Sequence, residues 1–96
     1  MRVYISGKIT GNEHFKTDFQ RGETEIIKRL GNVEIINPAR VNAELPPLTH
    51  EEYMRFSFME MELCETVFML KNWRESCRAS QEHGYAIAKG MKIIYE

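Results

Sequence analysis

The sequence has few cysteines and no cluster of metal-binding side chains. Its 96 residues contain only two cysteines, Cys64 and Cys77. They do not form a CxxC pair, and two cysteines cannot build the disulfide framework of a small secreted domain. No group of histidines, cysteines or carboxylates has the spacing of a metal site. We therefore expect two buried free thiols, and we expect neither a metal nor an organic cofactor.

Long hydrophobic runs are also missing. No apolar stretch approaches the ~18 residues that a membrane-spanning helix requires, and the N-terminus lacks the form of a signal peptide. The sequence therefore predicts a soluble, cytoplasmic protein with no membrane partner.

Neither sign of charge is in excess. Thirteen lysines and arginines stand against fourteen aspartates and glutamates, so the formal net charge is -1. The two signs are mixed along the chain without a basic stripe, and a nucleic-acid polymer is therefore not an expected ligand. Hydrophobic residues make up 43% of the chain and charged residues 28%, which excludes the disordered and coiled-coil classes. A chain of this length folds as one domain.

The sequence does contain an alternation of strand and helix patterns. Short β-rich runs predict strands at about 3–5, 33–36, 67–70 and 92–95. Apolar residues at helical spacing predict helices at about 13–30, 50–63 and 75–89, and Thr49 with Glu52 gives the second helix a capping-box pattern. Two prolines and the lack of periodicity predict a loop over residues 39–48.

This order of elements predicts a single α/β domain over residues 1–96 with the three-layer flavodoxin/Rossmann-like fold. About four parallel strands would carry helices on both faces. In such folds ligands bind at the carboxyl ends of the strands, beside a change in strand order. The segments 6–11, 37–48 and 71–76 follow predicted strands, so a site is expected among them.

Glycine and hydroxyl residues follow the first predicted strand, in the sequence SGKITG over residues 6–11. The backbone amides of such a loop can face an anion, and the side chains of Ser6, Lys8 and Thr10 can add donors. The alternative is a tight strand-to-helix turn that needs glycine for its dihedral angles. The segment matches neither a Walker A loop nor GxGxxG, so taken alone it favours the turn.

An acidic residue, Glu82, lies near the start of the last predicted helix. On a helical wheel Ala79, His83, Ala86 and Gly90 share one stripe, and Glu82 borders it. A carboxylate that leans back toward the strand ends can act as a nucleophile or a base. The alternative is a solvated glutamate on the flank of the helix, which periodicity alone favours. His83 is expected to pack in the core rather than to act as a base.

Trp73 follows the third predicted strand. It can stack on a planar ring of a ligand or cap the hydrophobic core, and the sequence gives equal weight to both. We therefore include Trp73 among the candidate substrate-binding residues.

Apolar residues cover both sides of the predicted helix at 50–63. One side can pack on the sheet, and the other side requires a cover. A second subunit is the simplest cover, so the pattern predicts a homodimer or a higher homo-oligomer. The alternative is that the loop with Pro46 and Pro47 folds over this helix.

Three stretches of the chain together resemble one known family. They are the opening VYISGKITG, the segment Asn37-Pro38-Ala39, and the run LCETVFMLKNWRESCRASQEHGYAIAKGMKII. They resemble the nucleoside 2-deoxyribosyltransferase superfamily, and most closely its small, often phage- or prophage-encoded members. The resemblance covers nearly the whole chain. Its most specific part is residues 76–84, where the superfamily places a catalytic glutamate six positions after an acidic or hydroxyl residue.

The resemblance implies a role for each matching residue. Glu82 matches the nucleophile that attacks the anomeric carbon of a deoxyribosyl group, and Ser76 matches a position that contacts sugar or phosphate. The residues that match the loop holding the nucleoside, and in nucleotide-cleaving relatives its 5′-phosphate, are Tyr4, Ser6, Gly7 and Lys8. The resemblance also implies retaining glycosyl transfer through a covalent glycosyl ester, and oligomers of at least two subunits.

The chain departs from the superfamily pattern at three positions. Ser57 stands where the base pocket usually holds an aspartate, and a serine cannot serve as a comparable acid near neutral pH. Glu65 stands where an aspartate commonly follows the cysteine. Arg78 replaces a glycine at the mouth through which the sugar should enter. We still expect Ser57 and Arg78 to line the substrate site.

These observations lead to three functional hypotheses, ranked here in order. The first is a nucleoside or nucleotide N-glycosidase, or a 2-deoxyribosyltransferase-like enzyme, with Glu82 as its nucleophile. The second is a non-catalytic binder of a nucleotide-like metabolite, in which Arg78 and Lys8 contact phosphate. The third is a structural α/β dimer without a functional pocket.

Overall fold

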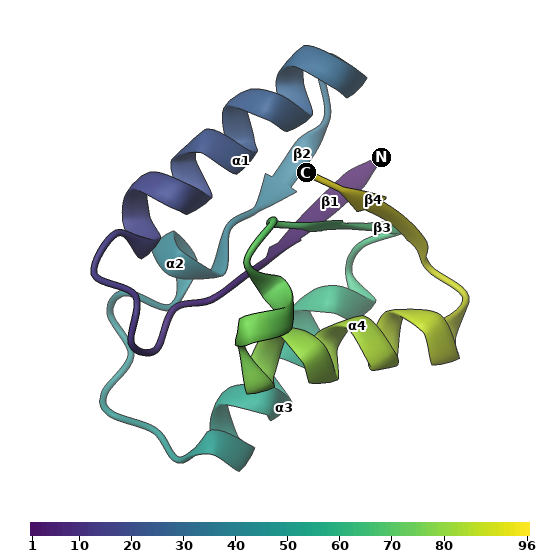
Figure 1. The fold of residues 1–96 in the computed structure, drawn as a ribbon. Helices are drawn as coiled ribbons and strands as arrows, with labels where there is room; N and C mark the ends of the chain where they lie inside the picture. The colour runs from purple at the N-terminus through teal and green to yellow at the C-terminus, as the bar shows by residue number, and fades with distance from the viewer.

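Four parallel strands form the sheet at the centre of the computed structural model, which describes residues 1–96 (Figure 1). The strands are β1 (Arg2–Ser6), β2 (Glu34–Ile36), β3 (Thr66–Met69) and β4 (Lys92–Tyr95). Their order in the sheet is β2-β1-β3-β4, and every neighbouring pair is parallel. The change of direction in this order lies between β1 and β3, so a ligand is expected at the carboxyl ends of these two strands.

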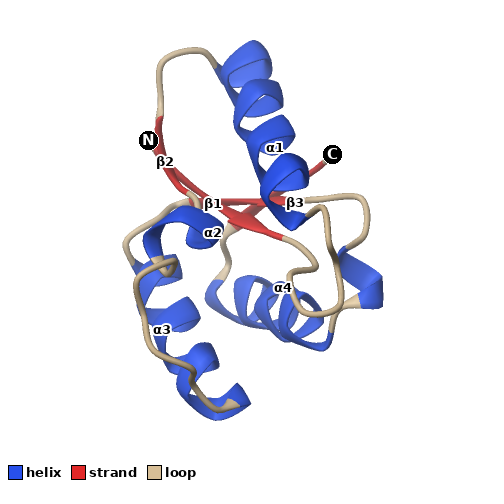
Figure 2. Cartoon of the chain, turned by 90° about the vertical axis from the view of Figure 1, so that its left-hand side faces the viewer, coloured by secondary structure: helices blue, strands red, loops and turns tan.

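Helices cover both faces of the sheet, which confirms the predicted three-layer flavodoxin/Rossmann-like α/β fold. Helix α1 (Phe15–Leu30) lies on one face, and helices α3 (His50–Glu62) and α4 (Cys77–Lys89) lie on the other (Figures 1 and 2). Two separate clusters of buried side chains fill the spaces between these layers. The α1 side includes Phe19, Ile26 and Phe68, and the α3/α4 side includes Met61, Val67 and Met69.

Strand β1 divides its side chains between the two layers. Successive residues of a strand point to opposite faces, so Val3 and Ile5 pack toward α1 while Tyr4 and Ser6 face the α3/α4 side. All four are fully buried. The two hydroxyl groups of β1 therefore lie together beneath α4.

The ends of the helices follow the chemistry of their capping residues. Thr49 and Glu52 form both hydrogen bonds of a capping box, as predicted. Ser76 caps α4 by accepting a hydrogen bond from the Ala79 amide, and Gly90 ends that helix in the left-handed conformation, with φ 69°. A short 3₁₀ turn, η1 (Trp73–Glu75), precedes α4, so α4 begins two residues later than predicted.

The predicted loop over residues 39–48 is wrong at its start, where the structure has a one-turn helix, α2 (Pro38–Val41). The Asn37 side chain accepts a hydrogen bond from the Ala39 amide, and Pro38 occupies a first-turn position that requires no amide donor. Four residues are too few to show a helical period, which is why the pattern did not reveal α2.

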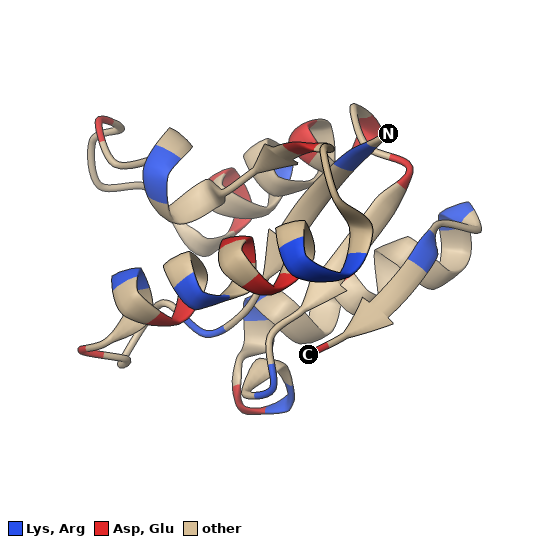
Figure 3. Cartoon of the chain, turned by 90° about the horizontal axis from the view of Figure 1, so that it is seen from above, with Lys and Arg blue, Asp and Glu red and all other residues tan.

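Charged residues of both signs are scattered over the helices and loops, as Figure 3 shows. No helix combines the length and the apolar character required to cross a membrane. Both cysteines are free, and Cys64 is buried as predicted. The prediction of a buried thiol is wrong for Cys77, which is exposed at the start of α4. Near the C-terminus, the Glu96 carboxylate accepts two hydrogen bonds from Arg21, at 2.6 and 3.1 Å, and a third from the Lys71 amide.

Candidate functional site

A buried glutamate, Glu82 of α4, lies at the carboxyl end of β1. Only 5% of its surface is exposed, and both of its carboxylate oxygens accept hydrogen bonds from β1. The Tyr4 hydroxyl donates to Oε2 at 2.9 Å, and the Ser6 hydroxyl donates to Oε1 at 2.6 Å. The solvated-glutamate alternative is therefore wrong, and the structure brings together three of the residues named from the sequence.

The packing of α4 places Glu82 on the buried face of the helix. The buried stripe consists of Ala79, Glu82 and Ala86, at spacings of three and four. The predicted stripe is therefore wrong, because it included His83 and Gly90 and placed Glu82 at its border. The buried face of α4 is rotated by about one residue from the predicted face. The two alanines let α4 approach the sheet closely, so the longer Glu82 side chain reaches the hydroxyls of β1.

Opposing effects act on the protonation of Glu82. Burial raises the pKa of Glu82 above its ordinary value, while hydrogen bonds from Ser6, Ser57 and Tyr4 and the charge of Arg78 oppose that rise. Burial and the Glu82 charge raise the pKa of Tyr4 well above its ordinary value, so this hydroxyl stays protonated and donates. Each oxygen of the carboxylate thus has a donor directed at it.

A small chamber of about 20 Å³ adjoins the Glu82 carboxylate. This volume holds about one water molecule and is too small for a sugar ring. Its walls come from β1, α1, α2, α3 and α4 and from the segments after β1 and α2, and they are formed by Tyr4, Gly7, Ile9, Phe19, Pro38, Asn42, Ser57, Arg78 and Glu82. We call it the inner chamber.

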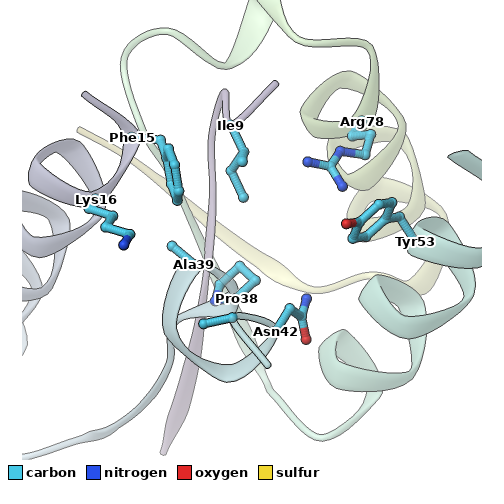
Figure 4. A pocket seen from close by; sticks show the side chains of 9 residues that line it. Ile9, Phe15, Lys16, Pro38, Ala39, Asn42, Tyr53 and Arg78 are labelled. Atoms are coloured by element: carbon cyan, nitrogen blue, oxygen red, sulfur yellow. The ribbon is translucent and has the colours of Figure 1, made fainter. Parts of the chain in front are cut away.

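A larger cavity of about 280 Å³ shares part of this wall (Figure 4). Four residues line both spaces: Ile9, Pro38, Asn42 and Arg78. Phe15 of α1 and Tyr53 of α3 stand on opposite sides of the larger cavity in Figure 4. This outer cavity is mostly apolar, contains two aromatic rings and offers a few polar groups, which is the character of a site for a planar organic ring.

Arg78 stands at the junction of the cavities. Its guanidinium lies 4.5 Å from the centre of the Tyr53 ring, and it donates a 3.4 Å hydrogen bond to the Thr10 hydroxyl. It has no carboxylate partner in an ion pair. It lines the inner chamber, the outer cavity and a third cavity of about 390 Å³, which also contains Thr10, His50 and Ser76. Arg78 is therefore the residue that the inner chamber and the two open cavities share.

Gly7 lines the inner chamber, and the chain packs tightly at this point. A Cβ atom at Gly7 would lie 2.5 Å from Leu70 Cδ1, so the side chain of Leu70 requires glycine here. The left-handed backbone occurs instead at Gly11, where φ is 75°. Close approach explains the first glycine of the SGKITG segment, and a turn explains the second.

Four predicted site residues line neither the inner chamber nor the outer cavity, and of these only Ser6 bonds to Glu82. Lys8 pairs with Glu75 at 3.9 Å. Ser76 caps α4 and lines the third cavity. Trp73 stacks on His83, with ring centres 4.1 Å apart, and packs against the α3/α4 core, which is the core-capping alternative. Their proposed contacts with substrate stay predictions.

The sequence analysis did not predict that Phe15 and Tyr53 flank the outer cavity, and it also missed two polar residues close to Glu82. Asn42 lines both the inner chamber and the outer cavity. Glu60 of α3 is 6% exposed, and its charge interacts with that of Glu82. Glu60 lies three residues after Ser57, and this spacing on one helix face was the signal that could have revealed it. No group of three or more histidine, cysteine or acidic side chains is arranged to hold a metal ion.

The fold and this site define the chain as a single-domain α/β protein with a buried, hydroxyl-bonded glutamate at the switch point of a parallel sheet. The chain belongs to the DUF4406 family, a domain of unknown function, whose profile matches residues 1–95. No curated protein and no solved structure matches it. The family description names no activity, so function must be argued from the site, and the resemblance to the nucleoside 2-deoxyribosyltransferase superfamily stays a prediction.

Proposed function

We propose that the protein cleaves or exchanges the N-glycosidic bond of a nucleoside or nucleotide, with Glu82 as its nucleophile, and that it is a distant relative of the nucleoside 2-deoxyribosyltransferases. One observation carries the proposal: a glutamate buried at the sheet's switch point accepts hydrogen bonds from two strand hydroxyls at 2.9 and 2.6 Å. An ionisable side chain in such a place costs stability and is typical of a functional site.

In the first step, a Glu82 oxygen attacks the anomeric carbon of the sugar. The carbon–oxygen ester bond forms while the bond from that carbon to the base nitrogen breaks through an oxocarbenium-like transition state. The electron pair of the broken bond goes to the base, which takes up a proton. Tyr4 and Ser6 hold the carboxylate in one orientation, so that the attacking oxygen needs little rearrangement.

In the second step, a water molecule or a second base attacks the same carbon and releases the Glu82 carboxylate. With water the products are the free base and the free sugar, and with a base the product is a new nucleoside. The outer cavity suits the base, because its volume of about 280 Å³ lies between Phe15 and Tyr53 and it shares a wall with the inner chamber.

Access to Glu82 requires that Arg78 move. In the structure the guanidinium rests on Tyr53, and the inner chamber holds about one water. Release of Arg78 from Tyr53 and Thr10 would join the chamber to the outer cavity, and the freed guanidinium would then be available to a phosphate.

The closed chamber also favours a second candidate function, a binder of a nucleotide-like metabolite without turnover. A ligand in the outer cavity would contact Arg78 and the aromatic rings, while Glu82 would stay unreachable behind Arg78. This function needs no motion of the site.

One experiment distinguishes the two functions. The protein is incubated with a panel of 2′-deoxynucleosides and their 5′-monophosphates, and released base is measured by chromatography. Glycosyl transfer predicts base release that falls by at least about 10³-fold in Glu82→Gln and is unchanged in Glu44→Gln, an exposed control. Thermal stabilisation by the same compounds without any release would establish the binder and refute the enzyme.

We also propose that the protein forms a homodimer through α3. Met59 and Leu63 lie one turn apart on α3 and its cap, and each is 57% exposed. The other side of α3, with Met54 and Met61, is buried. Light scattering during size-exclusion chromatography would show a dimer that Met59→Lys converts to a monomer, whereas a monomeric native protein would refute the proposal.

A further inference from the structure

A second carboxyl group is buried beside the Glu82 site, and the mechanism above gives it no role. Glu60 is 6% exposed, and its Oε1 atom is buried without any hydrogen-bond partner. An unsatisfied buried oxygen costs about 1–3 kcal/mol, so few of them occur without a reason. No ion pair includes Glu60.

The position of Glu60 relates it to the inner chamber. It follows Ser57 by three residues, so both side chains lie on the inner face of α3, and Ser57 lines the chamber. The Asn42 amide lies close to the Glu60 carboxyl and lines both the chamber and the outer cavity. The charge of Glu60 also acts on Tyr4 and on Glu82. Glu60 is therefore next to the residues that would surround the bond being cleaved.

Glu60 is suited to hold a proton while Glu82 is ionised. Burial raises the pKa of Glu60, and the neighbouring Glu82 charge raises it further, against the lowering effect of Asn42. Two carboxyl groups that interact in a buried place do not ionise together easily. The nucleophile requires the charge, and Glu60 is the member of the pair that has no hydroxyl donors to stabilise one.

We propose that Glu60 supplies the proton that the departing base takes up, through a water molecule in the inner chamber. Its O–H bond breaks, the water passes the proton on, and an N–H bond forms on the base as the glycosidic bond breaks. When water later resolves the ester, its surplus proton returns to Glu60, which restores the starting state. Glu60 contacts the water molecule and not the base, so it is a positioning residue that delivers the proton through this water. This role rests on the proposed function.

The test compares two leaving groups. A natural deoxynucleoside needs protonation of its base, whereas 4-nitrophenyl 2-deoxyriboside releases a stable phenolate without it. Glu60→Gln keeps the shape of the neutral acid but has no acidic proton. It should lower base release by about 10²-fold or more, and it should change nitrophenolate release by less than about threefold. Glu51→Gln, an exposed position of the same helix, is the matched control and should change neither.

Each outcome decides the matter. Equal losses on both substrates in Glu60→Gln, or no loss on either, overturn the role of Glu60 while leaving Glu82 as nucleophile. A native protein that cleaves neither substrate refutes the proposed function, and the role of Glu60 with it. If Glu60→Gln unfolds below the assay temperature, Glu60→Asp retains an acidic proton and should keep part of the base release, whereas Glu60→Ser should not.

Discussion

The buried carboxylate of Glu82 makes the stability of the fold depend on pH in a predictable direction. Because burial raises the folded-state pKa of Glu82 above its ordinary value of 4.5, the folded protein binds this proton more tightly than the unfolded chain does. The side chain therefore costs no stability below pH 4.5, and its cost grows as the pH rises from there through the folded-state pKa. Glu82→Gln removes this cost and keeps the shape of the side chain, since an amide can accept from one hydroxyl and donate to the other.

The size of the effect follows from the linkage of one proton to folding. A single group changes the free energy of unfolding by at most about 1.4 kcal/mol per pH unit. For a 96-residue domain this corresponds to a change of up to about 5–10 °C in Tm per pH unit. The Tm of Glu82→Gln minus that of the native protein should therefore be small near pH 4.5 and should increase steeply above it.

Thermal unfolding followed by circular dichroism from pH 4 to pH 9 measures this difference. Apart from Tyr4 and Glu60, whose pKa values depend on the Glu82 charge, the other titrating groups are common to the two proteins and largely cancel in the comparison. Glu44→Gln loses the same charge at an exposed loop position and should give a flat difference. A flat difference for Glu82→Gln as well, or one that favours the native protein as the pH rises, would contradict this account. It would show that burial does not raise the pKa of Glu82 in the folded protein.

Three further predictions concern other parts of the structure. Arg78→Ala should open the inner chamber and increase the labelling of Glu82 by a water-soluble carbodiimide several-fold, as mass spectrometry of the peptide would show. The control Arg74→Ala should not increase the labelling, because Arg74 lies over Trp73 instead. Equal labelling in both variants would contradict the role of Arg78 at the junction. Gly84→Ala should stabilise the fold by about 0.5–1 kcal/mol, because this position lies within α4 and an added Cβ meets no atom. Gly7→Ala should destabilise the fold by about 1–3 kcal/mol, because the added Cβ would clash with Leu70. A Tm change of the opposite sign in either variant would contradict the packing described. Burial would raise the pKa of Glu96, but hydrogen bonds from Arg21 and Lys71 lower it overall, so Glu96 stabilises the fold above pH 4.5 and loses this effect as the pH falls through its lower folded-state value; Glu96→Gln should cost about 1–2 kcal/mol at pH 7 and progressively less as the pH falls below 4.5, as urea titrations over this range would test.

The strand and helix order was predictable because each element carries a strong local signal. The apolar run at 67–70, the helical period at 13–30 and the capping box at Thr49 depend only on neighbouring residues, and all three agree with the structure. The one-turn helix α2 was not predictable from its period, because four residues span little more than one turn. Local sequence patterns therefore predicted the strands and helices that form the layers of the fold, but not the structure of the segments that connect them.

The site was predictable only in part, because it is assembled from distant segments. Tyr4, Ser6 and Glu82 were named from the sequence, and hydrogen bonds join them across more than 70 positions. The helical wheel placed His83 on the buried stripe instead of Glu82, since the wheel cannot show that two hydroxyls beneath α4 compensate a buried carboxylate. The sequence analysis did not name Glu60, although its spacing of three from Ser57 places the two residues on one face of α3.

The contact of Asn42 with this site was equally hidden from the sequence. Nothing in the segment after α2 shows that the turn of the chain brings this amide to the wall of the chamber. Such contacts depend on how distant elements meet, and only the three-dimensional arrangement reveals them.

The most direct test of the central claim is to trap the bond that Glu82 would form. A deoxynucleoside with fluorine at C2′ slows both steps, and a good leaving group restores the first, so a glycosyl ester should accumulate. Intact-mass spectrometry should show one added glycosyl group per chain, and peptide mapping should place it on Glu82, with no addition to Glu82→Gln. A label on another residue, or base release without any covalent adduct under these conditions, would contradict Glu82 as the nucleophile.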